Sequence, residues 1–157
     1  MHKLTTPVLI FALSACGTQS DTSDPTTLAR DAFDAGEYAK AEDQYAKALE
    51  GLDETDAAFA ELKIEHLQAL CYVNGDAALE GFAELKGRTT AAHYRKIAME
   101  LFNAKAHASA GEVVRAGEEA FPEDQQMTEF AARMVAQMRE DDSDAGREFL
   151  KGGGYWN

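Results

Sequence analysis

The chain has 157 residues, of which 45% are hydrophobic, so it is long enough for one domain with a single apolar core. Its 28 acidic and 15 basic side chains give a formal net charge of −13. Nucleic-acid binding depends on clustered Lys and Arg that neutralise phosphates, and no such cluster occurs here, so the composition excludes nucleic acid as a partner. An anionic lipid surface would repel the same charge, so attachment to a membrane needs another source.

The first fifteen residues are arranged like a signal peptide. Lys3 supplies a positive charge, residues 4–13 are predominantly apolar, and two small residues stand directly before Cys16. The apolar stretch is much shorter than the roughly 20 residues that span a bilayer as a helix. We therefore expect residues 1–15 to be removed rather than to form a transmembrane anchor.

Residues 13–16, Leu-Ser-Ala-Cys, resemble the lipobox of bacterial lipoproteins. In that family, diacylglycerol alkylates the cysteine thiol and a peptidase then cuts directly before it. The resemblance implies a lipid on Cys16 that holds the protein on the cell membrane or outer membrane, with its domain facing the periplasm or the exterior. The alternative is an ordinary secretory signal with a chance cysteine. Residues 16–24 then form the lipidated cysteine and a polar tether.

Apolar residues with helical spacing begin after Pro25, a residue well suited to the first position of a helix. They predict two helices separated by a break at Gly36. The same pattern returns from Tyr94 onward, displaced by 69 positions, close to twice a repeat of roughly 34 residues. We therefore expect an intervening helical pair between residues 56 and 87, with a long first helix, a break at residues 74–76 and a short second helix. The matched positions are Leu28 and Ile97, Ala41 and Ala110, Tyr45 and Val114, and Ala48 and Gly117.

These stretches resemble the tetratricopeptide repeat family. Residues 36–41, Gly-Glu-Tyr-Ala-Lys-Ala, with Tyr45, Ala48 and Leu49 are similar to the second helix of the repeat, and Pro122 falls where the family closes a repeat. The resemblance implies an all-α fold, a short right-handed solenoid of about three helical hairpins over residues 25–140. The alternative is a helical bundle without repeats.

A further amphipathic helix is predicted from about Glu123 to Glu140, with a methionine-rich apolar face that caps the stack. The alternative is that its methionines form an adaptable surface for a partner. Residues 141–157 are expected to form an acidic turn and a Gly-rich aromatic tail. That tail either folds back onto the last helix or docks into a partner.

The chain contains no convincing catalytic or metal-binding pattern. His66 has no second histidine four residues away, and His93 and His107 lack further ligands at metal-site spacing. Residues 141–152 begin like a calcium loop but lack its essential oxygen ligands. Cys71 lies in an apolar stretch and is expected to be a buried thiol. We therefore predict no enzymatic activity, no metal and no cofactor.

In the tetratricopeptide family, the first helix of each hairpin lines a groove that holds a peptide or a helix. The resemblance therefore implies an interaction scaffold that binds an envelope protein or peptide segment. The alternatives are an envelope enzyme or small-molecule or metal-binding protein, and a self-associating structural lipoprotein. The positions that match the groove are Arg30, Phe33, Asp34, Ala60, Ile64, Arg95, Met99, Phe102 and Asn103.

Overall fold

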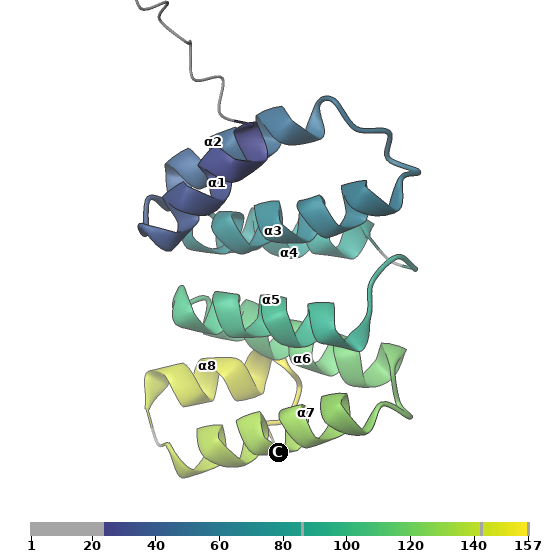
Figure 1. Cartoon of the computed structure of the whole chain (residues 1–157). Coiled ribbons are helices and arrows are strands. Elements are labelled where there is room, and N and C mark those ends of the chain that lie inside the picture. The colour runs from purple at the N-terminus through teal and green to yellow at the C-terminus, as the bar shows by residue number, and fades with distance from the viewer. Residues whose placement is uncertain (1–23, 86, 142, 157) are drawn as a thin grey trace, which may run out of the picture.

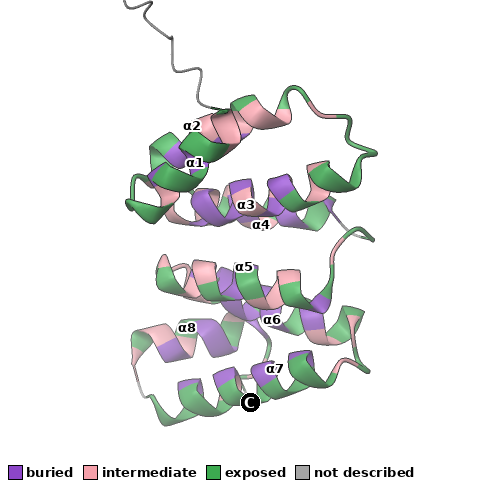
Figure 2. Cartoon of the chain, in the orientation of Figure 1, coloured by how far each residue is buried: buried purple, intermediate pink, exposed green. Residues whose placement is uncertain are grey.

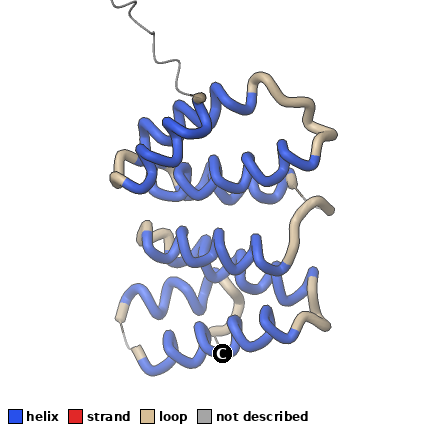
Figure 3. Tube along the Cα trace, viewed as in Figure 1, coloured by secondary structure: helices blue, strands red, loops and turns tan. Residues whose placement is uncertain are grey.

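The computed structural model describes residues 24–85, 87–141 and 143–156, and within these ranges the chain consists of helices joined by loops (Figures 1 and 3). The predicted signal peptide, Cys16 and nearly all of the tether lie outside the described residues. The all-α class predicted from the sequence is confirmed. The helices are α1 (Pro25–Asp34), α2 (Tyr38–Leu49), α3 (Ala57–Val73), α4 (Gly75–Glu84), α5 (Ala91–Asn103), α6 (His107–Ala120), α7 (Gln125–Glu140) and α8 (Asp144–Gly152).

The first six helices form three consecutive pairs. Pair one is α1 with α2, pair two is α3 with α4, and pair three is α5 with α6, and the partners within each pair pack against each other. Between pairs, α3 packs on α2 and on α5. Figure 1 shows the pairs following one another down the molecule, with α7 and α8 at the end of the stack.

Pairs one and three turn in the same way, at positions 69 residues apart. The turn of pair one has Gly36 at φ 75°, and the turn of pair three has Lys105 at φ 66°. In both turns the amide of the next residue donates to a carbonyl five positions earlier, Glu37 to Ala32 at 2.8 Å and Ala106 to Leu101 at 2.9 Å. This is the hydrogen-bond pattern that closes a helix through a left-handed residue. The two turns are therefore built alike although one contains lysine instead of glycine.

The interiors of these two pairs also correspond. Buried small residues occupy matched positions in both, since Ala29 and Ala98 are fully buried, as are Ala41 and Ala110. Small side chains at such positions let neighbouring helices approach closely. Positions 69 residues apart are therefore alike in their burial as well as in the geometry of the turn.

Pair two has a different connection. Its helices α3 and α4 have 17 and 10 residues, so the first is long and the second short, as the sequence indicated. A single residue, Asn74, separates them, and its side chain accepts a hydrogen bond from the amide of Ala77 at 3.1 Å. The predicted break was wider, because Gly75 and Asp76 already belong to α4.

Two apolar clusters hold the stack together, and the buried residues in Figure 2 lie mainly between neighbouring helices. The larger cluster runs from α3 to α8 and contains Leu67, Ile97, Leu101 and Phe149, all fully buried. The smaller cluster joins α1 and α2 to α3 and consists mainly of alanines with Tyr45 and Leu62. Pair one is therefore attached through less apolar surface than the other pairs.

Helix α7 begins where Asp124 caps the free amide of Met127 at 2.7 Å. Its apolar face is part of the core, as predicted. The buried residues are Met127, Phe130, Ala131, Met134 and Met138.

Helix α8 lies in the region that the sequence analysis assigned to an acidic turn and a tail. It is capped by Ser143, and it packs against α6 and α7 with Phe149 fully buried. The chain after it also folds back, since the Tyr155 hydroxyl donates to Glu118 at 2.5 Å. Residues 143–156 are therefore part of the domain.

Helices α6 and α8 touch at glycines. A Cβ atom on Gly111 would overlap the carbonyl oxygen of Phe149, and one on Gly152 would overlap that of Ala108. Both obstacles are backbone atoms, which cannot move away as a side chain can. The contact between α6 and α8 therefore requires glycine at both positions.

We predict that Gly111→Ala and Gly152→Ala each lower the free energy of unfolding by about 1–3 kcal/mol, as overpacking of a core does. Gly51→Ala is the control, because a Cβ atom there meets nothing within 4 Å. Urea unfolding of the three variants checks this. Equal stability of Gly111→Ala and Gly51→Ala would contradict the close contact.

The matched turns give a second prediction. Lys105→Gly should raise the free energy of unfolding by about 1 kcal/mol, because glycine adopts positive φ without strain, whereas Gly36→Lys should lower it by a similar amount. The same urea measurement applies. Opposite signs for the two substitutions are expected, and a loss of stability in Lys105→Gly would show that residue 105 is not left-handed.

Candidate functional site

The first helices of successive pairs are joined by polar contacts. Between α1 and α3, the Arg30 guanidinium binds the Glu65 carboxylate through two hydrogen bonds of 2.8 Å, and the Tyr45 hydroxyl donates to the same carboxylate at 3.2 Å. The hydrogen bond from Arg30 holds the pKa of Glu65 below its usual value. Burial and the neighbouring Glu65 raise the pKa of Tyr45 to about 12. Glu65 is thus ionised and Tyr45 neutral at physiological pH.

Between α3 and α5, Glu100 has the equivalent role. The Tyr72 hydroxyl donates to its carboxylate at 2.6 Å, and the amide of the buried Gln68 donates at 3.2 Å. Burial, and then the hydrogen bond to Glu100, raise the pKa of Tyr72 above its ordinary value. The Tyr72 ring is therefore held in one orientation at the end of α3.

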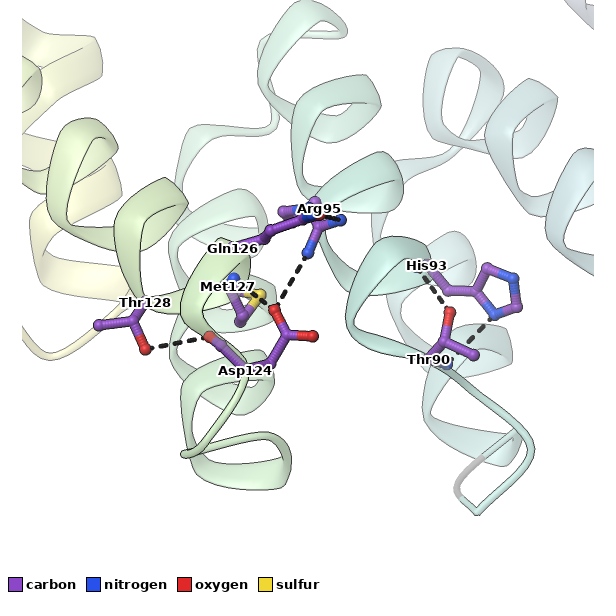
Figure 4. A network of polar contacts seen from close by, with 7 residues as sticks. All are labelled: Thr90, His93, Arg95, Asp124, Gln126, Met127 and Thr128. Atoms are coloured by element: carbon purple, nitrogen blue, oxygen red, sulfur yellow. Dashed lines mark hydrogen bonds and ion pairs between the residues drawn. The ribbon is translucent and has the colours of Figure 1, made fainter.

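The third junction joins α5 to the start of α7 (Figure 4). Arg95 donates to Gln126 at 2.9 Å and lies 3.5 Å from the carboxylate of Asp124, the residue that caps α7. At the start of α5, Thr90 and His93 cap each other, with the His93 amide donating to the Thr90 hydroxyl at 3.4 Å. The contacts of Arg95 therefore join α5 to the start of α7, and the contacts between Thr90 and His93 cap α5.

An open hollow of about 620 Å³ lies where pairs one and two meet. The rings of Tyr38 and Tyr72 stack at 3.8 Å between centroids, and Phe33 lies edge-on to both at 5.4 and 6.3 Å. Val73 lies beside these rings and is 48% exposed. We call this hollow the aromatic notch. Its lining residues are Gly36, Glu37, Tyr38, Ala39, Lys40, Tyr72 and Val73.

The three groove positions predicted in α1 have different environments in the structure. Arg30 is engaged with Glu65, Phe33 supports the rings of the notch, and Asp34 is exposed at the end of α1. Of these three, Phe33 contacts a notch residue directly.

The positions predicted in α3 do not form part of an accessible groove. Ile64 is only 2% exposed and belongs to the larger core cluster, so its assignment to the groove is wrong. The physical reason is that α3 packs on α2, α4 and α5, which cover it on several sides. Ala60 is half-buried near the start of the same helix.

The positions predicted in α5 are spread along that helix. Arg95 binds residues at the start of α7, Met99 is 39% exposed, and Phe102 packs edge-on against His107 with centroids 4.9 Å apart. Asn103 is exposed at the end of α5.

Tyr72 and Val73 are not predicted as site residues by the sequence pattern, which identifies Tyr38 only as a repeat position. Tyr72 and Val73 end an apolar run that begins at Leu70, and periodicity alone does not show which side chains of that run are exposed. Their position directly before the break at Asn74 is the feature of the sequence that could have indicated that they are accessible. Residues at helix ends beside a turn are accessible more often than those within a helix.

The remaining titratable groups of interest are buried. His66 is 7% exposed, and burial lowers its pKa although its Nε2 atom lies 3.1 Å from the Glu42 carboxylate. Burial also raises the pKa of the Cys71 thiol to about 12, so it is protonated and unreactive. Within residues 24–85, 87–141 and 143–156, no group of three or more His, Cys, Asp or Glu side chains is placed to hold a metal ion.

In the described part of the chain, none of the helices has the length and apolar character needed to cross a membrane. No protein-family model, curated protein or solved structure matches the chain.

The lowered pKa of His66 predicts a pH dependence of stability. The unfolded chain binds a proton on this residue near pH 6.5, whereas the folded chain does so only at lower pH, so the stabilisation is present above 6.5 and is lost as the pH falls. The free energy of unfolding should therefore decrease between pH 7.5 and 5.5. The decrease should be smaller in His66→Gln, and identical slopes in both proteins would contradict the assignment.

Proposed function

We propose that this chain is a bacterial lipoprotein whose tetratricopeptide-like domain binds a segment of another protein in the cell envelope. The repeated turn of pairs one and three and the stacking of three helical pairs support a repeat architecture. Stacked repeats offer an extended surface on which a partner segment contacts several helices. The domain serves as a scaffold or adaptor and not as an enzyme.

The observation that carries this proposal is the aromatic notch. Its rings are already held in place, Tyr72 by Glu100 and Tyr38 by stacking on Tyr72, and Val73 is exposed beside them. A preformed apolar surface binds a partner without the entropy loss of ordering its own side chains. Exposed apolar and aromatic side chains grouped in a hollow are typical of a binding site.

The lipid anchor is supported by the lipobox-like residues 13–16 and by the short polar segment before α1. A tether of this length places the domain roughly 15 Å from the lipid. Two or three acyl chains attached to Cys16 hold it there almost permanently, because each buried methylene contributes about 0.8 kcal/mol. The scaffold thereby acts close to a membrane facing the periplasm or the exterior.

The binding role is tested by placing a photo-crosslinking amino acid at Val73 in the full chain and irradiating intact cells of the bacterium that produces it. Leu28 is the control position, because it is an apolar residue of similar accessibility, 37% exposed, on α1. We expect one discrete crosslinked protein from position 73 and none from position 28. Absence of a crosslink at position 73, or the same products from both positions, would contradict the proposed site.

The anchor is tested separately by growing cells with an alkyne-bearing palmitate and comparing the full chain with Cys16→Ser. Labelled protein in the membrane fraction is expected for the native chain only, because the lipid is attached to the sulfur atom of Cys16. Equal labelling of Cys16→Ser would show that the lipid is attached elsewhere, and an unlabelled native chain would eliminate the anchor.

A further inference from the structure

We infer that the aromatic notch receives an aliphatic side chain from a lysine- or arginine-rich segment of the partner protein. This inference rests on the proposed function and specifies the chemistry of the partner. It combines two observations, namely the apolar lining of the notch and the uneven distribution of charge along the chain.

The negative charge is concentrated in the part of the chain that builds the notch. Residues 24–84 contain fifteen acidic and four basic side chains, whereas residues 85–157 contain twelve acidic and ten basic ones. Nearly the whole net charge therefore belongs to pairs one and two.

Most basic side chains of this region are already neutralised by their neighbours. Arg30 pairs with Glu65 at 2.8 Å, Lys40 with Glu37 at 2.7 Å, and Lys47 with Asp43 at 2.5 Å. These three account for all but one of the four basic residues between positions 24 and 84. The remaining carboxylates far outnumber the cations near them and produce a strongly negative field around pairs one and two.

Several of these carboxylates stand close in sequence to the lining of the notch. Asp31 and Asp34 precede it on α1, and Asp76 follows Val73 by three positions. All three are exposed. The wall itself contains Glu37 and Lys40, which pair with each other at 2.7 Å. A segment that enters the notch therefore meets an apolar floor with a predominantly acidic surround.

The two features have different physical roles. Burial of an aliphatic side chain against Tyr38, Tyr72 and Val73 provides affinity, since apolar contact contributes roughly 25 cal/mol per Å² removed from water. Positive charges on either side of that anchor increase the rate of encounter and exclude acidic segments. Lys and Arg also bind favourably to the exposed faces of aromatic rings.

A second hollow, between α4 and α6, differs in charge. It has a volume of about 410 Å³ and is lined in part by Phe82, Tyr94, Val113 and Arg115. It lies mainly in the half of the chain whose charge is nearly balanced. Charge complementarity therefore selects the notch, and not this hollow, as the site for a basic segment.

The test uses the full chain in detergent micelles and three fluorescently labelled peptides: Lys-Lys-Leu-Lys-Lys, Lys-Lys-Ser-Lys-Lys and Glu-Glu-Leu-Glu-Glu. Fluorescence anisotropy measures their dissociation constants at low and high salt. We expect binding of the first peptide, weaker binding of the second because it lacks the anchor, and no binding of the third. Affinity for the first peptide should fall as salt screens the charges.

Matched variants locate the site. Val73→Ser should weaken binding of Lys-Lys-Leu-Lys-Lys by about tenfold, equivalent to about 1.4 kcal/mol. Leu28→Ser, which removes a comparably exposed apolar residue, should leave binding unchanged. The pair Asp34→Asn with Glu37→Gln should weaken binding more than Glu50→Gln with Glu54→Gln, which removes the same charge in the segment that follows α2. All six positions are exposed, so the variants keep the core intact.

The inference is overturned by equal effects of Val73→Ser and Leu28→Ser, by equal effects of the two charge-removing pairs, or by comparable binding of the acidic peptide. The first two results would show attraction to the acidic surface as a whole. Failure of the inference is distinguishable from failure of the proposed function. A crosslink from Val73 to a segment without Lys or Arg would retain the scaffold and reject the basic partner.

Discussion

The structure depends on one constraint: in the described part of the chain, each helical pair buries apolar side chains against a neighbouring element. Each pair is completed by the next, and at the end of the stack α7 and α8 cover what pair three leaves open. Small residues make this possible, because Ala98 and Ala110 are fully buried within pair three and Gly111 touches the backbone of α8. The interior from α3 to α8 is therefore one apolar cluster, and pair one adds a second, smaller cluster that it shares with α3.

The surface follows from the same arrangement. Glu65 and Glu100 each join one first helix to the next through two or more hydrogen bonds, so the helices cannot slide independently. The aromatic notch lies where these junctions meet, with rings from pairs one and two and with Tyr72 hydrogen-bonded to Glu100 of pair three. Because three pairs position the side chains of the notch, the notch keeps its shape only while these pairs remain packed together. The proposed binding therefore depends on the fold.

Much of this fold could be predicted from the sequence, because the 69-residue displacement and the helical spacing are local properties. The reasons for the failures are specific. Ile64 was placed in a groove by counting positions, but α3 lies in the middle of the stack and is buried on several sides. Helix α8 was read as turn and tail because its glycines suggest a loop, whereas Gly152 is needed for contact with α6. Tertiary packing determines both the burial of Ile64 and the helical structure of α8, and the spacing of apolar residues in the sequence does not show how helices pack. The positive φ of Lys105 was equally hidden, since lysine rarely adopts it.

The most direct test of the account is a crystal structure of the domain in the full chain, in which residues 28–49 are superimposed on residues 97–118. The account predicts that the two segments coincide through both helices and the turn, with residues 36 and 105 left-handed and Phe33 and Phe102 in equivalent places. Segments that differ in the angle between their helices, or a right-handed conformation at residue 105, would contradict it.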